Sequence, residues 1–257
     1  MFSRRTILRG LTAAGMLPLG HPAFCRPVTF RMVYFGDFAP FSQLDTTGRV
    51  RGMFVDAAEG ILHEKLGQTV DHQAFPWARA QAMVKGGEAD GFLTVPTPER
   101  LSYVLASTRP VFTFPMCIVA APDNPRLDEL RRVRHLEELK PFRIGHYIGS
   151  GWAEANLRPL GLDIQWAADL TGAMRLVANG RVDALVDNAV SMRLRLSTPE
   201  FNGRLLELPG PLATQGYHLC IGRSSPFTGL MPQIDALLAR RPAGGGPAPV
   251  AKATCSR

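Results

Sequence analysis

One short pattern occurs twice in this sequence, and it limits the possible folds more than any other feature. Residues 83–93 read MVKGGEADGFL and residues 176–186 read LVANGRVDALV, so each copy runs V-x-x-G-x-x-D into apolar residues. Each copy also follows a candidate amphipathic helix, residues 77–84 and 172–177. Glycine commonly ends a helix because it adopts a left-handed backbone without steric cost. Each copy therefore predicts a helix, a glycine stop and a strand, and the pair predicts two related α/β lobes.

The start of the folded region supports the same class. Residues 28–35 are rich in strand-forming side chains, and residues 54–66 carry apolar side chains at helical intervals, with Gly67 where a C-terminal cap belongs. A strand followed by a helix and another strand opens an α/β domain. At 257 residues the chain is long enough for two modest domains.

Both ends of the chain differ from the region between them. Residues 1–26 hold an arginine pair, Arg4-Arg5, and then an uncharged apolar run from 10 to 19, much shorter than the roughly 20 residues that span a bilayer. We expect a cleaved export signal of the twin-arginine type and a periplasmic location. Residues 242–257, rich in glycine and proline at their start, are expected to be disordered.

Charge and cysteine usage exclude several classes of function. The signal holds four of the 29 basic residues and none of the 22 acidic ones, so the mature chain carries a net charge of +3, and no nucleic-acid partner is indicated. The basic run at residues 126–140 is interleaved with acidic residues, as on a solvated helix face. The four cysteines and six histidines show no metal-ligand spacing, so neither a metal nor a cofactor is expected.

A series of short motifs resembles one protein family. The motifs are FAPF at 38–41, GMFVDA at 52–57, PWAR at 76–79, GEAD at 87–90, TPER at 97–100, RIG at 143–145, GS at 149–150 and GRVD at 180–183. Their order is similar to that of the extracytoplasmic solute-binding proteins of polar amino-acid ABC transporters, known as bacterial solute-binding protein family 3. The resemblance covers roughly residues 28–240.

The resemblance implies a two-lobed α/β fold, the type II periplasmic-binding-protein fold, with two hinge strands and a ligand cleft between the lobes. Lobe 1 would comprise residues 27–118 and 216–241, and lobe 2 residues 119–215. The partners implied are a small-molecule ligand, an amino acid or small organic acid, and an ABC transporter permease, with the protein itself a monomer. Ligands of open α/β sheets bind beyond the carboxyl ends of the strands, where these motifs fall.

Arg100 is the first candidate for ligand binding. Thr97 is predicted to cap a helix that begins with Pro98, which places Arg100 in the first helical turn, where a positive charge is unfavourable unless an anion completes the site. The family uses the arginine of this motif to hold the α-carboxylate of its ligand. The alternative is an arginine that pairs with an acidic side chain.

Other candidates come from both lobes. The loop with Ser150 and Gly151 would offer donors to the same carboxylate, although many family members have a second hydroxyl residue in place of the glycine. Phe38 and Trp77 match positions that wall the ligand, and Thr94 and Thr97 would add hydroxyl groups. For Phe41 and Trp152 a place in the core or on the surface is favoured.

The main departure from the family is at Asp187 and Asn188. Members that bind amino acids carry a carboxylate at the position aligned with Asn188, where it neutralises the ammonium group of the ligand. Either Asp187 replaces it through a one-residue shift, which would turn the side chain to the other face of a regular strand, or the ligand has less need of a cation site.

Three further alternatives remain open at this stage. Some exported dehydratases of the cyclohexadienyl or prephenate type resemble this fold, and Glu154 or Asp187 would then be the general acid. A carboxylate without an amino group is another candidate ligand. A sensory input module normally continues into a transmembrane helix, and none is expected in this sequence after residue 26. Binding without chemistry is the favoured function, since no nucleophile and base motif is found.

The segments PMCIVAAP (115–122) and HLCIGRSSP (218–226) are expected to be the two hinge strands. If they are adjacent, a Cys117–Cys220 disulfide is conceivable, but buried free thiols are favoured.

Overall fold

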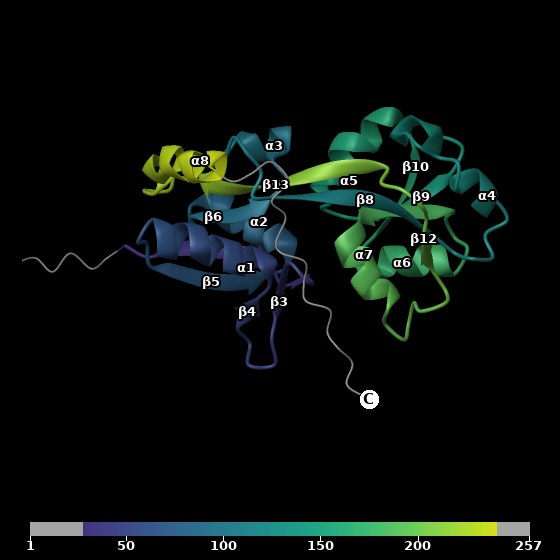
Figure 1. The fold of residues 1–257 in the computed structure, drawn as a ribbon, viewed down its shortest axis with the longest axis horizontal. Coiled ribbons are helices and arrows are strands. Elements are labelled where there is room, and N and C mark those ends of the chain that lie inside the picture. Colours follow the sequence, from purple (N-terminus) through teal and green to yellow (C-terminus); the bar gives the residue numbers. More distant parts are fainter. Residues whose placement is uncertain (1–27, 241–257) are drawn as a thin grey trace, which may run out of the picture.

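The computed structural model describes residues 28–240, which form two lobes joined by two long strands (Figure 1). The expected export signal (residues 1–26) and the expected disordered tail (residues 242–257) lie outside the described residues. In the part of the chain that is described, no helix has the length and apolar character needed to cross a bilayer.

Lobe 1 is built on a sheet in which β1 lies between two parallel neighbours, β5 and β6. A small antiparallel sheet of β2, β3 and β4 extends from it. The strands are β1 (Phe30–Phe35), β2 (Asp37–Phe38), β3 (Ser42–Leu44), β4 (Val50–Arg51), β5 (Val70–Phe75), β6 (Gly91–Thr94) and β7 (Val104–Ala106). The helices are α1 (Met53–Ala58), η1 (Glu59–Lys65), α2 (Trp77–Gly86), α3 (Pro98–Leu101), η4 (Thr228–Leu230) and α8 (Met231–Ala239).

Lobe 2 repeats the arrangement, with β9 between two parallel neighbours, β10 and β11. Its strands are β9 (Arg143–Tyr147), β10 (Asp163–Ala167), β11 (Ala184–Asn188) and β12 (Leu206–Glu207). Its helices are α4 (Leu127–Leu130), η2 (Leu136–Leu139), α5 (Gly151–Asn156), η3 (Arg158–Leu160), α6 (Leu170–Ala178) and α7 (Ala189–Leu196).

The strands β8 (Phe112–Ala120) and β13 (Ala213–Gly222) run from one lobe to the other and pair with each other in antiparallel register (Figure 1). Along β8, Phe112 and Phe114 belong to the core of lobe 1, whereas Met116 and Ile118 belong to the core of lobe 2. The change from one lobe to the other therefore falls near the middle of β8. The exact lobe boundaries expected from the sequence remain a prediction.

The repeated sequence pattern forms the same local structure twice. After helices α2 and α6, Gly87 and Gly180 have φ values of 78° and 64°, which favour glycine, and strands β6 and β11 follow. The aspartate of each copy then fixes the first strand of its lobe. A carboxylate oxygen of Asp90 accepts a hydrogen bond of 2.8 Å from the backbone N–H of Arg31, and Asp183 accepts one of 2.8 Å from that of Arg143.

Some expectations need adjustment. The helix expected over residues 54–66 changes at Glu59 from α to π geometry, and Gly67 follows it with φ 67°. The basic run forms two short helices, α4 and η2, rather than one helix face, and its exposed arginines pair locally, as Arg126 does with Glu129 at 2.8 Å.

The conceivable disulfide does not form. Cys117 lies in the half of β8 that pairs with β11, opposite Asp187, whereas Cys220 lies opposite Phe92 and Ala106. Both cysteines are buried free thiols.

Candidate functional site

A cavity lies between the two lobes and is lined by residues from both. The space open to the centres of water-sized molecules is about 60 Å³. Since one water needs ~10–15 Å³ by this measure, the cavity has room for about five water molecules or one small solute. Seven of the nine expected ligand-binding residues line it: Phe38, Trp77, Thr94, Arg100, Ser150, Gly151 and Asp187.

Arg100 reaches the cavity from α3, and the expected helix start is present. Thr97 caps the helix, accepting a hydrogen bond of 3.3 Å from the backbone N–H of Arg100, and Pro98 is its first residue. Thr97 therefore positions Arg100 and lies in a neighbouring groove instead of the cavity. With only four residues, α3 adds little helix dipole, so the guanidinium itself supplies the positive charge.

The guanidinium of Arg100 is buried without a counter-ion. The side chain is 4% exposed, its Nε donates to Oε1 of Gln81 at 3.0 Å, and one terminal nitrogen donates to the carbonyl of Val95 at 2.9 Å. Burial lowers the pKa of Arg100 from its ordinary value. Among residues 28–240 no acidic side chain forms an ion pair with it. A buried guanidinium without a counter-ion would be stabilised by an anionic ligand.

Because Gly151 has no side chain, the loop of lobe 2 can lie directly against Arg100 of lobe 1. A Cβ at this position would lie 2.5 Å from a terminal nitrogen of the guanidinium and 2.8 Å from its Cζ. The hydroxyl residue that many family members carry there would require the guanidinium, which is the far end of a flexible side chain, to move. On its other side the guanidinium lies 5.2 Å from the ring centre of Trp77, so lobe 1 and lobe 2 enclose it together.

Each lobe also contributes a hydroxyl group to the cavity wall. Ser150 is buried and caps α5, and its oxygen accepts a hydrogen bond of 3.3 Å from the N–H of Ala153. The Ser150 hydroxyl also interacts with the side chain of Tyr147, so an acceptor in the cavity would compete with Tyr147 for the serine proton. Thr94, at the end of β6, adds a second hydroxyl from lobe 1.

Asp187 and Asn188, at the end of β11, have different roles: one lines the cavity and the other caps a helix. Asp187 lines the cavity: one carboxylate oxygen accepts a hydrogen bond of 2.6 Å from the N–H of Asn188, and the other is buried without a partner among the described residues. Burial raises the pKa of Asp187 to about 6. Asn188 is not in the cavity wall; it caps α7, accepting from the N–H of Val190 at 2.9 Å. Of the two residues, Asp187 is therefore the one whose side chain lies in the cavity wall.

His146 also lines the cavity, and it was not among the residues expected from the sequence. Its Nε2 lies 3.1 Å from the carbonyl of Val186, and its Nδ1 accepts from the N–H of Tyr147 at 3.0 Å. Both nitrogens are thus occupied, and burial lowers the pKa of His146 to about 4, so the ring is neutral at physiological pH. Its place at the carboxyl end of β9, beside the Ser150 loop, is the signal that would have identified it.

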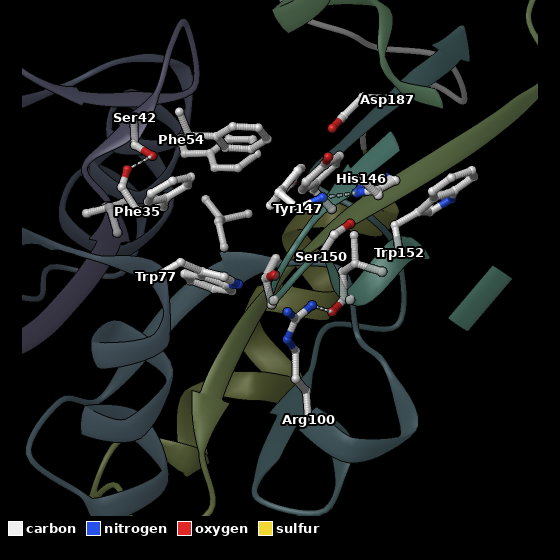
Figure 2. A pocket seen from close by; sticks show the side chains of 18 of the residues that line it. Phe35, Ser42, Phe54, Trp77, Arg100, His146, Tyr147, Ser150, Trp152 and Asp187 are labelled. Carbon is white, nitrogen blue, oxygen red and sulfur yellow. Dashed lines mark hydrogen bonds between the residues drawn. The ribbon is translucent and has the colours of Figure 1, made fainter. Parts of the chain in front are cut away.

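Aromatic rings form most of the remaining wall. In Figure 2, Phe35, Phe54 and Trp77 lie on one side of the cavity, and Ser150, His146 and Asp187 lie on the other. Trp152 packs into the core of lobe 2 and also lines the cavity, whereas Phe41 is fully buried in the core of lobe 1.

Two contacts outside the cavity also join the lobes. The hydroxyl of Ser191 in α7 donates to the carbonyl of Ala39 at 3.1 Å. A terminal nitrogen of Arg195 lies 3.4 Å from a carboxylate oxygen of Asp37. With these contacts made and Arg100 enclosed, the structure is that of a closed cleft.

Several solved structures share this fold. A histidine kinase sensor domain with similarity to periplasmic binding proteins has a TM-score of 0.69 at 21% identity, over 82% of this chain and 89% of its own. An ancestral arginine-binding protein bound to arginine has a TM-score of 0.64 at 22% identity, over 82% and 91%. The substrate-binding protein of an amino acid ABC transporter has a TM-score of 0.63 at 19% identity, over 82% and 92%. At such identities the likeness establishes the fold, the two-lobed periplasmic-binding-protein fold expected from the sequence.

Comparison of sequences gives the family. No curated protein matches the chain significantly. The model of one family, described as bacterial extracellular solute-binding proteins, family 3, matches residues 30–202, which is more than half of the chain. The family is one of binding proteins and not of enzymes. This chain belongs to the bacterial extracellular solute-binding proteins of family 3.

Proposed function

We propose that the protein binds an α-amino acid in the cavity between its lobes, with Arg100 holding the carboxylate and Asp187 the ammonium group. One observation carries the proposal: the cavity contains a buried guanidinium and a buried carboxylate oxygen, and neither forms an ion pair among the described residues, although Arg195 lies near enough to Asp187 to act on its pKa. Unpaired buried charges are costly, so such a site favours a ligand that carries both opposite charges. A zwitterionic amino acid is the simplest such ligand.

The neighbours in structure support the amino-acid assignment. One is bound to arginine and another serves an amino acid ABC transporter. By the same reasoning the protein is exported to the periplasm, works as a monomer and delivers its ligand to an ABC transporter permease. Ligand binding favours the closed arrangement of the lobes, which the permease then recognises.

The dehydratase alternative is not favoured. Glu154, one candidate for its general acid, lies in the outer groove and accepts a hydrogen bond of 3.0 Å from Arg158. The other candidate, Asp187, is explained by an ammonium partner. An organic acid without an amino group would leave the second oxygen of Asp187 unpaired, so this ligand class is also less suited to the cavity.

The test compares ligands that differ by one charged group. Mature protein, residues 27–257, is unfolded and refolded to remove bound solute and then melted with amino acids, the matching acids without the amino group, and the matching amines. A ligand at 100 times its dissociation constant should stabilise the protein by about 2.7 kcal/mol. Only the compounds with both groups should do so.

Two variants complete the test. Arg100→Ala and Asp187→Asn should each abolish the stabilisation by amino acids, and Arg100→Ala should leave the melting temperature without ligand nearly unchanged. A large loss of ligand-free stability in Arg100→Ala would mean that Arg100 has a structural role. Equal stabilisation by the acids without an amino group would rule out the ammonium site.

A further inference from the structure

The charges of the cavity limit the side chain of the ligand. Among the lining residues, all within 28–240, Arg100 is the one basic side chain charged at neutral pH and Asp187 is the one acidic side chain. His146 adds no charge because both of its ring nitrogens are occupied by backbone groups. If the two charged residues hold the carboxylate and ammonium of an amino acid, no charged residue is left to pair with a charged side chain.

Two of the polar groups on the lobe 1 side of the cavity are also occupied, which leaves the neutral hydroxyl groups of Thr94 and Tyr217 there. The hydroxyl of Ser42 donates to the carbonyl of Phe35 at 2.7 Å, and the hydroxyl of Tyr34 lies 2.8 Å from Nδ1 of His72. A guanidinium or ammonium group placed against this wall would give up its hydration and find few acceptors in return.

What this side offers instead is a continuous aromatic surface. Phe38 is at its centre, with ring centres 4.7 Å from Phe41, 6.0 Å from Phe35, 6.2 Å from Phe54 and 6.4 Å from Tyr217. Phe38 is only partly buried by these rings and also lines the cavity. Figure 2 shows Phe35, Phe54 and Trp77 across the cavity from Ser150 and Asp187. Aromatic rings prefer apolar partners and other rings in tilted or offset geometry.

We propose that the ligand is an amino acid with a neutral, apolar side chain, preferentially an aromatic one, which packs on the surface formed by Phe35, Phe38, Phe54 and Tyr217. Because the cavity has room for about five water molecules in this structure, an aromatic ligand requires the lobes to close less far than they do here. Arginine, lysine, aspartate and glutamate are excluded. This inference rests on the proposed function and goes beyond it, because it separates this protein from the neighbour that is bound to arginine.

Arginine is the competitor that the test must include, because a guanidinium can stack on an aromatic face. Stacking returns only part of the hydration energy that a cation loses when it is buried without a carboxylate. In this cavity the sole carboxylate, Asp187, is already required by the α-ammonium group. We therefore expect arginine to bind at least 100-fold more weakly than phenylalanine.

The experiment measures dissociation constants by calorimetry on refolded mature protein for phenylalanine, leucine, alanine, arginine, lysine and glutamate. Phenylalanine and leucine should bind most tightly. The variant Phe38→Ala should weaken phenylalanine binding at least tenfold and change alanine binding less than threefold, because only the larger side chain reaches that ring. Leu44→Ala, at an exposed position of β3 outside the cavity, is the matched control and should bind as the wild type does.

The outcomes separate the two proposals. Tighter binding of arginine, lysine or glutamate than of phenylalanine would overturn the side-chain inference but not the proposed function. Equal binding of all six amino acids, or tightest binding of alanine, would have the same consequence. Binding of 3-phenylpropanoate as tight as that of phenylalanine would overturn the proposed function, and absence of binding by every amino acid in a folded sample would overturn both.

Discussion

Replacement of Asp187 by asparagine should stabilise the protein without ligand while it destroys the binding site. The carboxyl group is buried, one of its oxygens has no partner in the described part of the chain, and its pKa is raised from 3.8 to about 6. A carboxyl group whose pKa is higher in the folded state stabilises the fold only when protonated, so its contribution is lost as the pH rises through 6. Above that pH the charged form of Asp187 opposes folding.

The size of the effect follows from the shift in pKa. A change from 3.8 to about 6 is about 2.2 units, and each unit corresponds to 1.36 kcal/mol, so ionised Asp187 costs the folded state about 3 kcal/mol at pH 7.5. Asparagine keeps the oxygen that accepts from the N–H of Asn188 and carries no charge. Asp187→Asn should therefore gain up to about 3 kcal/mol at pH 7.5 but only about 0.5 kcal/mol at pH 4, where the carboxyl group is protonated in the folded state and about half ionised in the unfolded state.

The assay is urea unfolding of the ligand-free protein and the variant at pH 4, 6 and 7.5. The quantity of interest is the difference in unfolding free energy between the two proteins, because the other titrating groups cancel in it. The affinity of the wild type for an amino acid should fall about tenfold per pH unit below 6, as Asp187 becomes protonated. A variant that is less stable than the wild type at pH 7.5 would refute the assignment of an unpaired buried carboxylate. A difference that does not change with pH would mean that Asp187 is solvated in the ligand-free protein, whose lobes are then open.

Three further predictions test the closed cleft and the core. Gly151→Ala places a methyl group against the guanidinium of Arg100 and should weaken ligand binding at least tenfold in calorimetry. The unfolding midpoint of the ligand-free protein should not change. An unchanged affinity would show that Arg100 does not lie against this loop in the liganded state. Asp37→Asn removes an ion pair between the lobes whose carboxylate is 70% exposed, and because exposed pairs contribute about 0–1 kcal/mol the affinity should fall at most about fivefold. Cys117 and Cys220 should both be alkylated in unreduced, denatured protein and protected in folded protein, and a disulfide-linked peptide in the mass spectrum would contradict the register of β8 and β13.

The sequence was sufficient for the architecture because its signals are local. The two glycines that end α2 and α6, Thr97 and Pro98 at the start of α3, and the strand preferences of the crossing segments all depend on neighbours in the chain. The same local logic selected Arg100 from its place in the first helical turn, although α3 has only four residues and adds little of the helix dipole which that argument assumed.

The rest of the site depends on contacts between distant segments. The sequence alone left Asp187 and Asn188 undecided, because which of them turns inward is set by where β11 ends and α7 takes its cap. His146 looked like any lone histidine, since its partners are backbone groups of β11 and of its own strand. Gly151 read as a missing donor, and its close approach to Arg100 appears only when both lobes are in place.

The distribution of charge between the lobes links ligand binding to closure. Arg100 belongs to lobe 1 and Asp187 to lobe 2, and each is buried in a cavity that forms only when the lobes meet. Closure without a ligand therefore takes two charges out of water and pairs neither of them, which is unfavourable. A ligand with both charges removes that cost in the closed state by pairing with Arg100 and Asp187. In the open state these two side chains are solvated, so pairing with the ligand stabilises them less. Since a ligand shifts an equilibrium only by its difference in affinity for the two states, this placement of charge makes a zwitterion an effective closing ligand, and a solute with one charge a poor one.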